Sequence, residues 1–268
     1  MRVSDRLRCF SYGGGVQSTA AMVLAATRRI EFPHFVFANV GDDAENPATI
    51  AYIRDVAAPY AAANGIALHT VRKEWRDGRE QTLYGHIMRE DRMGVQIPVR
   101  LSNGAPARRH CTVDYKIKVL DKWQREHGAS EDNPAIVGLG ISVDEMQRMR
   151  TSQEAGRVIV YPLVEMRLTR GDCAGIIRAA GLPVPPKSSC WFCPYRTRTE
   201  WQRMRHEEPE LFGKAIEMER SMSRRMEAQG EGKVTMHSKG SLSQITDDAV
   251  QLPLGEPEDS CESGYCMV

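Results

Sequence analysis

The chain has 268 residues, 41% of them hydrophobic, which is enough for a substantial core in one large α/β domain or in a main domain with a small appendage. Its 36 Lys and Arg residues are nearly balanced by 35 Asp and Glu residues, so the overall charge excludes a globally basic nucleic-acid binder and limits any such contact to a patch. Charged residues near the start and the lack of a long apolar run argue against a signal peptide and a membrane span, and we expect a cytoplasmic protein.

A glycine run follows the first predicted strand. Residues 7–11 are typical of a short buried strand and residues 19–29 of a helix with an apolar face. Successive glycines let the backbone approach a ligand closely, and hydroxyl groups stand beside the free N–H groups of the first helical turn. The pattern predicts a phosphate-binding loop, with a glycine turn that binds nothing as the alternative. The candidate binding residues are Ser11, Gly13, Gly14, Gly15, Gln17, Ser18 and Thr19.

Further predicted strands alternate with helical segments. A helix runs from Pro47 to about Asn64 and Gly65 is its expected C-cap. Alternation of this kind predicts an α/β fold with a doubly wound parallel sheet, whose ligands bind beyond the carboxyl ends of the strands. The glycine run lies at such an end. The remaining predicted strands are 35–40, 66–71, 135–139 and 158–161.

The composition changes after Gly181, where a proline cluster begins. We expect a nucleotide-binding domain over 1–180, a small helical subdomain with a Cys-x-x-Cys motif over 181–228, and a flexible tail over 229–268. Residues 94–106 are predicted to form an irregular loop over the active face.

Cysteines supply the second chemical signal. Seven cysteines in a cytoplasmic chain indicate metal binding, redox chemistry or simple burial. Cys190 and Cys193 have the spacing of a metal-binding turn, with a redox disulfide or structural thiols as alternatives. Cys111 is the expected third ligand, and iron–sulfur is favoured over zinc. The fourth is Cys266, ahead of Cys261 and His110, while Cys9 and Cys173 are expected to be small buried side chains.

Acidic residues follow two of the predicted strands. Asp42, Asp43, Asp144 and Glu145 are candidates for Mg²⁺ or ribose contacts, or they are simple turn and capping carboxylates. Arg148 stands one helical turn after Asp144 and Glu145, so we expect it to fold back onto the same site.

Basic residues gather around and after the cysteines. They are predicted to line a phosphate-rich acceptor, with aromatic side chains stacking on bases, or else to form solvated helix surfaces. The basic residues are Arg108, Arg109, Lys116, Lys118, Arg196, Arg198, Arg203 and Arg205, and the aromatic ones are Trp191, Phe192 and Trp201.

Taken together, these segments resemble the PP-loop ATP-pyrophosphatase superfamily, in the branch of adenylylsulfate and phosphoadenylylsulfate (PAPS) reductases, related to enzymes of DNA phosphorothioation and tRNA thiolation. The family loop is Ser-Gly-Gly-x-Asp-Ser, and here Gly13 and Gln17 replace the first Ser and the Asp. Similar matches are found at 40–49, 138–148 and 161–172. Cluster-bearing reductases carry a Cys-Cys pair before the later Cys-x-x-Cys, and here the pair is Cys111 and Thr112.

The resemblance implies an adenine nucleotide alpha hydrolase-like, Rossmann-like fold that binds ATP with Mg²⁺ or an adenylyl substrate. It also implies adenylation of an acceptor, here a nucleobase or nucleic acid, followed by sulfur transfer from a donor protein or sulfide. Ser18, Arg108, Arg109 and Arg148 are its expected catalytic residues and Asp42 a further nucleotide contact. The alternatives are a reductase that releases sulfite through Cys261 or Cys266, which the tail order 263–266 disfavours, and a nucleotide-binding subunit without catalysis.

Overall fold

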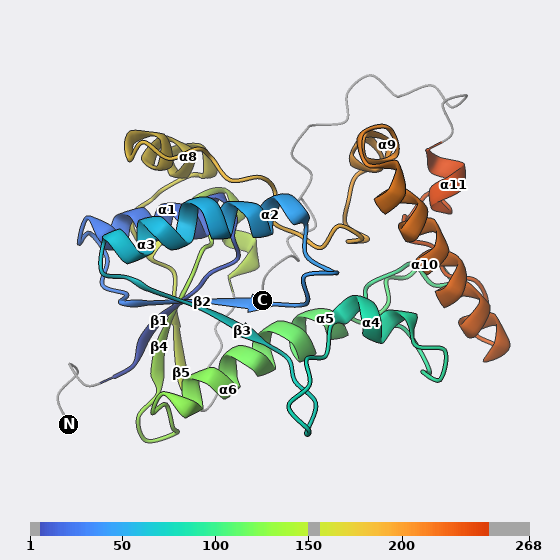
Figure 1. Ribbon diagram of the computed structural model, residues 1–268, viewed down its shortest axis with the longest axis horizontal. Helices are drawn as coiled ribbons and strands as arrows, with labels where there is room; N and C mark the ends of the chain where they lie inside the picture. The colour runs from blue at the N-terminus through green and yellow to red at the C-terminus, as the bar shows by residue number, and fades with distance from the viewer. Residues whose placement is uncertain (1–5, 150–155, 247–268) are drawn as a thin grey trace.

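The computed structural model describes residues 6–149 and 156–246, and its centre is a parallel β-sheet (Figure 1). Five strands lie in the order β3-β2-β1-β4-β5, and every neighbouring pair is parallel. This order and the helices on both faces confirm the α/β, doubly wound fold class. The strands are β1 (Arg8–Ser11), β2 (His34–Asn39), β3 (Ala67–Arg72), β4 (Ala135–Leu139) and β5 (Arg157–Val160).

Helices connect the strands and continue beyond the sheet. Those of the sheet region are α1 (Val16–Ala26), α2 (Pro47–Tyr52), the π-helical turn η2 (Ile53–Ala57), α3 (Ala58–Ala63), α5 (His110–Thr112), the π-helical turn η3 (Val113–Ile117), α6 (Lys118–Glu126), the 3₁₀ helix η4 (Val143–Arg148), α7 (Pro162–Glu165) and α8 (Arg170–Ala179). The others are α4 (Leu83–Met88), α9 (Arg198–Glu207), α10 (Pro209–Ala228) and α11 (Leu242–Ile245).

Side chains of the strands alternate between the two faces of the sheet. Phe10 and Phe35 pack with α1, α3 and α8 on one face. Cys9 and Val36 pack with Trp123 of α6 on the other. The alternation of side chains holds β1 between two buried layers. This in turn fixes the position of the loop that follows β1.

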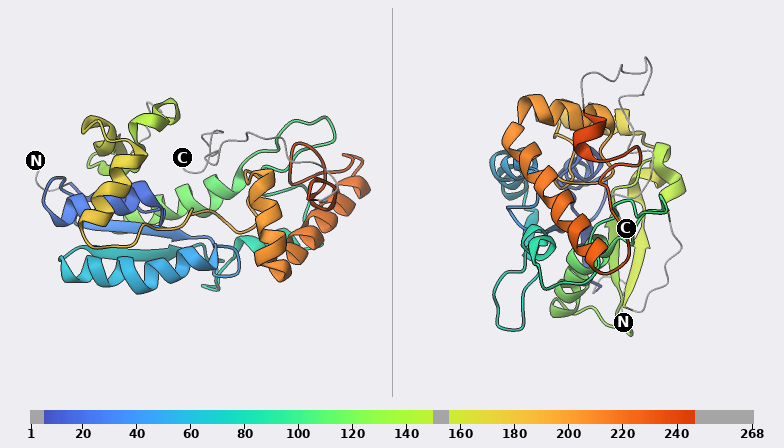
Figure 2. Two further views of the ribbon diagram at one scale, coloured as in Figure 1. Left: turned by 90° about the horizontal axis from the view of Figure 1, so that it is seen from above. Right: turned by 90° about the vertical axis from the view of Figure 1, so that its right-hand side faces the viewer.

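A second hydrophobic core lies beside the carboxyl ends of the strands, where α4, α9, α10 and α11 gather (Figures 1 and 2). Its largest fully buried side chains include Trp201 and Phe192. Residues 83–101 contribute Leu83, Ile87 and Val99 to the same core. This second core therefore joins a segment from the middle of the sheet region to the C-terminal helices.

Two boundaries differ from the sequence expectation. Within the helical subdomain expected over 181–228, the charged stretch after Thr197 forms two helices, α9 and α10, because Pro209 begins a new helix after Glu208, whose backbone is not helical. The segment expected to be a flexible tail from 229 contributes Val234, Met236 and Leu242 to the second core before the description ends at 246. The division into three domains stays a prediction.

No helix among the described residues is long and apolar enough to cross a membrane.

Candidate functional site

The glycine run forms the turn between β1 and α1, at the point where the strand order reverses. Gly14 has φ +72°, and an added Cβ would lie 2.8 Å from Cγ2 of Thr49. Only glycine fits there without strain. Gly15 is the N-cap of α1 and makes no side-chain capping bond. The loop therefore packs against the start of α2. Its backbone groups lie at the N-terminus of α1.

The amide groups of the loop divide into occupied and open ones. The amide of Gly13 donates to Oγ of Ser18 over 3.3 Å, and that of Thr19 donates to the carbonyl of Gly15 over 3.0 Å. Within the described parts of the chain, the amides of 14–18 have no hydrogen-bond partner. Open amides at the start of an eleven-residue helix form a cradle for an anion.

The two hydroxyl groups of the loop have different surroundings. Ser18 is 1% exposed, and its hydroxyl donates to the carbonyl of Gly15 over 3.1 Å. Thr19 is also buried, and its Oγ1 lies 3.1 Å from the hydroxyl of Tyr12. Ser18 thus stiffens the loop. The sequence predicted that the hydroxyl of Thr19 would lie beside the open amides, but it faces the core instead.

Gln17 links the loop to two other segments. Its Nε2 donates to Oε2 of Glu145 over 3.1 Å, and its Oε1 accepts from Nη1 of Arg170 over 3.3 Å. Nη1 of Arg148 lies 2.8 Å from the same Glu145 oxygen. Arg148 therefore folds back onto Glu145 as expected, and Arg170 is a contact that the sequence did not single out.

The aspartates at the strand ends are held by protein partners. Asp42 forms a bidentate pair with Arg72, and its bonds to Asn39 and Arg72 lower its pKa. Asp43 accepts from the hydroxyl of Thr82 over 2.9 Å, and burial raises its pKa. These contacts favour structural roles at the end of β2 for both carboxylates.

Asp144 is held in a different way. Both of its carboxylate oxygens accept from the amide of Arg170, over 3.2 and 3.1 Å. Asp144 therefore fixes the start of α8 beside the 3₁₀ helix η4.

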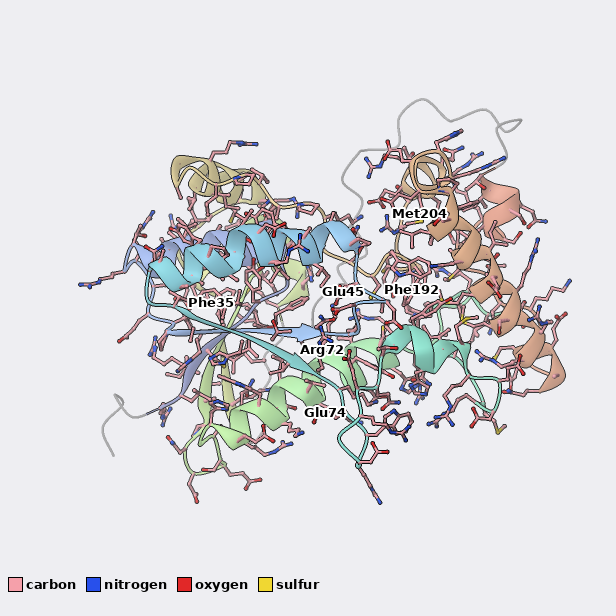
Figure 3. All side chains as sticks on the ribbon, viewed as in Figure 1. Phe35, Glu45, Arg72, Glu74, Phe192 and Met204 are labelled. Carbon is pink, nitrogen blue, oxygen red and sulfur yellow. The ribbon has the colours of Figure 1, made fainter. Side chains whose placement is uncertain are left out.

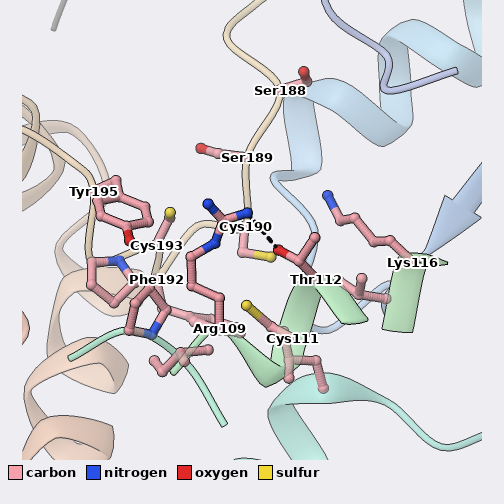
Figure 4. A pocket seen from close by; sticks show the side chains of 15 residues that line it. Arg109, Cys111, Thr112, Lys116, Ser188, Ser189, Cys190, Phe192, Cys193 and Tyr195 are labelled. Atoms are coloured by element: carbon pink, nitrogen blue, oxygen red, sulfur yellow. Dashed lines mark hydrogen bonds between the residues drawn. The ribbon is translucent and has the colours of Figure 1, made fainter. Parts of the chain in front are cut away.

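A cavity next to the loop brings three cysteines together (Figure 4). We call it the thiol cavity, and its labelled lining residues in Figure 4 are Arg109, Cys111, Thr112, Lys116, Ser188, Ser189, Cys190, Phe192, Cys193 and Tyr195. Nη2 of Arg109 donates to Oγ1 of Thr112 over 3.2 Å. Ser11 lies close by, because it lines a neighbouring cavity that shares Thr112 and Lys116 with this one.

The thiol cavity and the glycine loop meet at Ser188. A Cβ added to Gly15 would lie 2.6 Å from Oγ of Ser188, which also lines the cavity. The backbone of Gly15 has φ −102°, so it is this close approach that requires the missing side chain. Anion cradle and thiols therefore belong to one site.

Charge and burial act on the thiol of Cys111 in opposite directions. Burial raises the pKa of Cys111, while Lys116, a hydrogen bond with Thr112, and Arg109 oppose that rise. The described cysteines form no disulfide bonds. Cys9 and Cys173 are buried away from the cavity, and burial raises the pKa of each to about 12, which confirms them as small core side chains.

The donor set of the cavity consists of three thiols, those of Cys111, Cys190 and Cys193. Within 6–149 and 156–246, no three His, Cys, Asp or Glu side chains converge closely enough to hold one metal ion. Thiolates are ligands of both zinc and iron–sulfur clusters. Cys261 and Cys266 lie outside the described residues.

Glu45 is a buried acid that sequence reasoning missed, and Figure 3 shows it between the sheet region and Phe192. It is 3% exposed, and its backbone pairs with Cys190 in an isolated antiparallel bridge. Burial raises its pKa, with Lys116 as the main opposing charge. Its Oε1 has no hydrogen-bond partner among the described residues. Its neighbours in sequence are acidic turn residues, so nothing in the pattern marked it.

The predicted base-stacking side chains belong to the second core. Trp191, Phe192 and Trp201 are at most 3% exposed, so the expectation that they stack on bases is wrong. Nε1 of Trp191 donates to the carbonyl of Asp43 over 2.7 Å. These rings fill the second core because α9 and α10 need an apolar face to pack on.

Several predicted basic contacts are structural as well. Arg198 donates to the carbonyl of Ile245 over 2.7 Å, and Arg205 to that of Thr246. Arg196 is buried near the ring of Trp201, whereas Arg203 is exposed on α9 and Lys118 pairs with Asp114. The expectation that all of these line an acceptor is therefore wrong.

Arg108 and Arg109 point to different places. Arg109 lines the thiol cavity. Arg108 is exposed and lines a separate open cavity with His110 and Arg92. Of the two, the structure brings only Arg109 to the thiols, and His110 is not beside them.

Comparison with known proteins gave matches among solved structures. No family model and no curated protein matches the sequence. Matching structures include the phosphoadenylyl-sulfate (PAPS) reductase from Candida auris as a phosphate complex, with 13% identity over 68% of this chain and 77% of that chain and a TM-score of 0.43. Another is the U34-tRNA thiolase NcsA from Methanococcus maripaludis with its 4Fe-4S cluster, with 12% identity over 94% of this chain and 84% of that chain and a TM-score of 0.40.

Proposed function

We propose that this protein binds ATP with its phosphates over the glycine loop, adenylates an acceptor, and transfers sulfur to it, with an iron–sulfur cluster held in the thiol cavity. The observation that carries the proposal is Ser188, which touches the loop at Gly15 and lines the cavity of Cys111, Cys190 and Cys193. A phosphate site and a sulfur site that share one residue suit a reaction that uses both.

The glycine loop supplies the nucleotide site in this proposal. The amides of 14–18 stand open at the N-terminus of α1. Such amides stabilise the negative charge that develops on pyrophosphate as it leaves, because they are already oriented. Mg²⁺ bound with ATP would neutralise further charge on the phosphates.

Three thiols and a cationic rim supply the sulfur site. Cys111, Cys190 and Cys193 would hold the cluster, whose open iron would carry the sulfur that is transferred. Arg109 and Lys116 line the same cavity and attract an anionic substrate or sulfur species to it.

The proposed reaction balances without an external electron donor. An oxygen of the acceptor attacks the α-phosphorus of ATP, and the bond from that phosphorus to pyrophosphate breaks. A sulfur nucleophile at the oxidation level of sulfide, from a donor protein or free sulfide, then forms a carbon–sulfur bond while the carbon–oxygen bond to AMP breaks. The acceptor is a nucleobase in a nucleic acid, whose carbonyl oxygen and flanking phosphates match the cationic cavity.

Product analysis under anaerobic conditions tests the proposal. Purified protein is expected to absorb near about 400 nm from its cluster. With ATP, Mg²⁺, sulfide and RNA or DNA oligonucleotides, it is expected to release pyrophosphate and AMP in equal amounts and to leave a thiolated base that mass spectrometry detects.

Two results would contradict this assignment. Release of sulfite from an adenylylsulfate substrate, without pyrophosphate release from ATP, would make the protein a reductase. Tight binding of ATP without turnover of any acceptor or sulfate ester would favour a nucleotide-binding subunit.

A further inference from the structure

Gln17 occupies the loop position at which the resembled family carries an aspartate. Three segments far apart in sequence meet at this side chain: the loop, the 3₁₀ helix η4 and the start of α8. We call Gln17, Ser142, Glu145, Arg148 and Arg170 the Gln17 cluster.

The cluster is closely packed. Gln17 is 8% exposed, and the side chains of Arg148 and Glu145 are 8% and 16% exposed. Ser142 also lies within 3.4 Å of Nε2 of Gln17. The backbone leaves little room for change, because a Cβ on Gly140 would lie 3.2 Å from the amide nitrogen of Ser18.

An amide is the group that this position requires. Its nitrogen donates to the carboxylate of Glu145 while its oxygen accepts from the guanidinium of Arg170. A carboxylate at position 17 has acceptors only, so it would keep the contact with Arg170 and place a second negative charge against Glu145. An aspartate here, which is one methylene shorter than Gln17, would therefore lose the bond to Glu145 and add repulsion between two negative charges.

Within the part of the chain that the structure describes, Arg148 keeps an unpartnered donor in the cluster. Glu145 pairs with its Nη1, while its buried Nε has no hydrogen-bond partner among the described residues. Arg170 approaches from the other side of Gln17. Two guanidinium groups are thus linked to Gln17, Arg170 directly and Arg148 through Glu145, and Gln17 lies in the first turn of the helix whose amides are open.

We infer that Gln17 is a positioning residue: its amide joins Glu145 to Arg170 and so holds Arg148 and Arg170 beside the loop, where they bind the terminal phosphates of the nucleotide. The inference deepens the proposed function and rests on it. It assigns the recognition of the β- and γ-phosphates to a cluster that depends on Gln17 being uncharged.

Restoring the family residue tests the inference. Gln17→Asp is expected to weaken ATP binding about tenfold or more while AMP binding stays within about twofold, because AMP lacks the terminal phosphates. The double variant Gln17→Glu with Glu145→Gln exchanges acid and amide at unchanged side-chain length across the same contact, so it is expected to recover most of the ATP affinity. Calorimetric titration with ATP and AMP measures both.

Gln147→Asp is the matched control. Gln147 is exposed on the same 3₁₀ helix next to Arg148, so it adds the same charge nearby without entering the cluster. It is expected to bind ATP like the unchanged protein, and thermal unfolding shows whether every variant is folded.

The outcomes separate the two levels of the proposal. Unchanged protein that binds no ATP overturns the proposed function and the role of the cluster with it. Unchanged protein that binds ATP, together with a folded Gln17→Asp that binds ATP equally well, overturns the inference alone. Equal weakening of ATP and AMP binding, or a double variant no better than Gln17→Asp, also overturns it.

Discussion

The glycine loop and the thiol cavity are built in opposite ways. The loop is a short continuous segment, 13–19, whose open backbone amides are fixed by the strand before it and the helix after it. The thiol cavity collects side chains from around 97–116 and 188–195, which only the second core brings together. The loop depends on the absence of side chains at its glycines, whereas the thiol cavity depends on the presence of each of its side chains.

This difference separates two kinds of vulnerability. Substitutions in the loop act by filling space or by changing the backbone conformation. Substitutions in the cavity act by removing a thiol or a charged group. Ser188 belongs to both regions, because it contacts Gly15 and lines the thiol cavity.

The largest expected effect comes from filling the space between the two regions. Gly15→Val places branched carbons where Oγ of Ser188 stands 2.6 Å from an added Cβ, next to the open amides. ATP affinity is expected to fall by about 100-fold, since the phosphates lose their close approach. Calorimetric titration measures the affinity.

Gly213→Ala is the matched control for that substitution. Gly213 lies in α10, and an added Cβ there meets nothing within 4 Å. It is expected to leave ATP binding unchanged and to raise the free energy of unfolding by about 0.5–1 kcal/mol. A Gly15→Val protein that is folded and binds ATP normally would contradict the proposed role of the space between the loop and the cavity in ATP binding.

Removal of one thiol is expected to act on the cavity alone. Cys190→Ser should lower bound iron and sulfide about 10- to 100-fold and bleach the visible absorption, while ATP affinity stays within about twofold. Iron and sulfide assays of anaerobically purified protein measure the loss. Cys173→Ala, which changes a buried thiol outside the cavity, is expected to keep its metal. Equal metal content in both variants would refute the ligand set.

A third prediction concerns the second core that supports the cavity. The carboxylate of Glu219 accepts from the amides of Met236 and Leu242, over 2.7 and 3.0 Å, and is buried. Glu219→Ala leaves these two amides unsatisfied and is expected to lower the free energy of unfolding by about 1–3 kcal/mol. Chemical denaturation measures it. Glu217→Ala on the exposed side of the same helix is the control, and equal losses would contradict the anchoring role.

The smallest expected effect is a dependence of stability on pH. Burial lowers the pKa of His86 to about 4, with Arg92 and Lys73 adding to the effect. In the unfolded chain its pKa returns to about 6.5. Between these values the unfolded state binds the proton and the folded state does not. Stability from this group is therefore full above about pH 6.5 and declines as the pH falls toward 4.

Comparison with a variant isolates this contribution. His86→Gln is expected to remove about 1 kcal/mol of the decline in unfolding free energy between pH 7 and pH 5, because residual water reduces the full effect. Denaturation curves at the two pH values measure it. The other histidines contribute equally to the pH dependence of the unfolding free energy in both proteins. An identical pH dependence would therefore show that His86 contributes nothing.

Sequence reasoning located the sheet and the loop because their signals are local. Strand β4 lies at 135–139 as expected, and α2 begins at Pro47 with Asn46 as its cap. Helix α1 begins at Val16, three residues before the expected start, because Gly15 caps it directly. The roles of the loop residues, of Arg109 and of the three described cysteines stay predictions.

Sequence reasoning failed where burial decided the role of a side chain. Trp201 and Phe192 stand in a stretch rich in arginines, which is typical of a nucleic-acid surface, yet both are fully buried. Arg198 donates to a main-chain carbonyl of the segment beyond α10. Charge and aromaticity have the same pattern on a binding face and at the margin of a small core, and only packing distinguishes them.

The amino-acid sequence by itself determined the alternating strands, the glycine turn after the first strand and the close spacing of Cys190 and Cys193, because periodicity, glycine runs and short spacings are properties of adjacent residues. Only the tertiary structure decided that Ser188 closes over Gly15 and that Gln17 meets Glu145, a residue 128 positions away. Contacts of that length depend on how layers pack, and no local pattern in the chain records them.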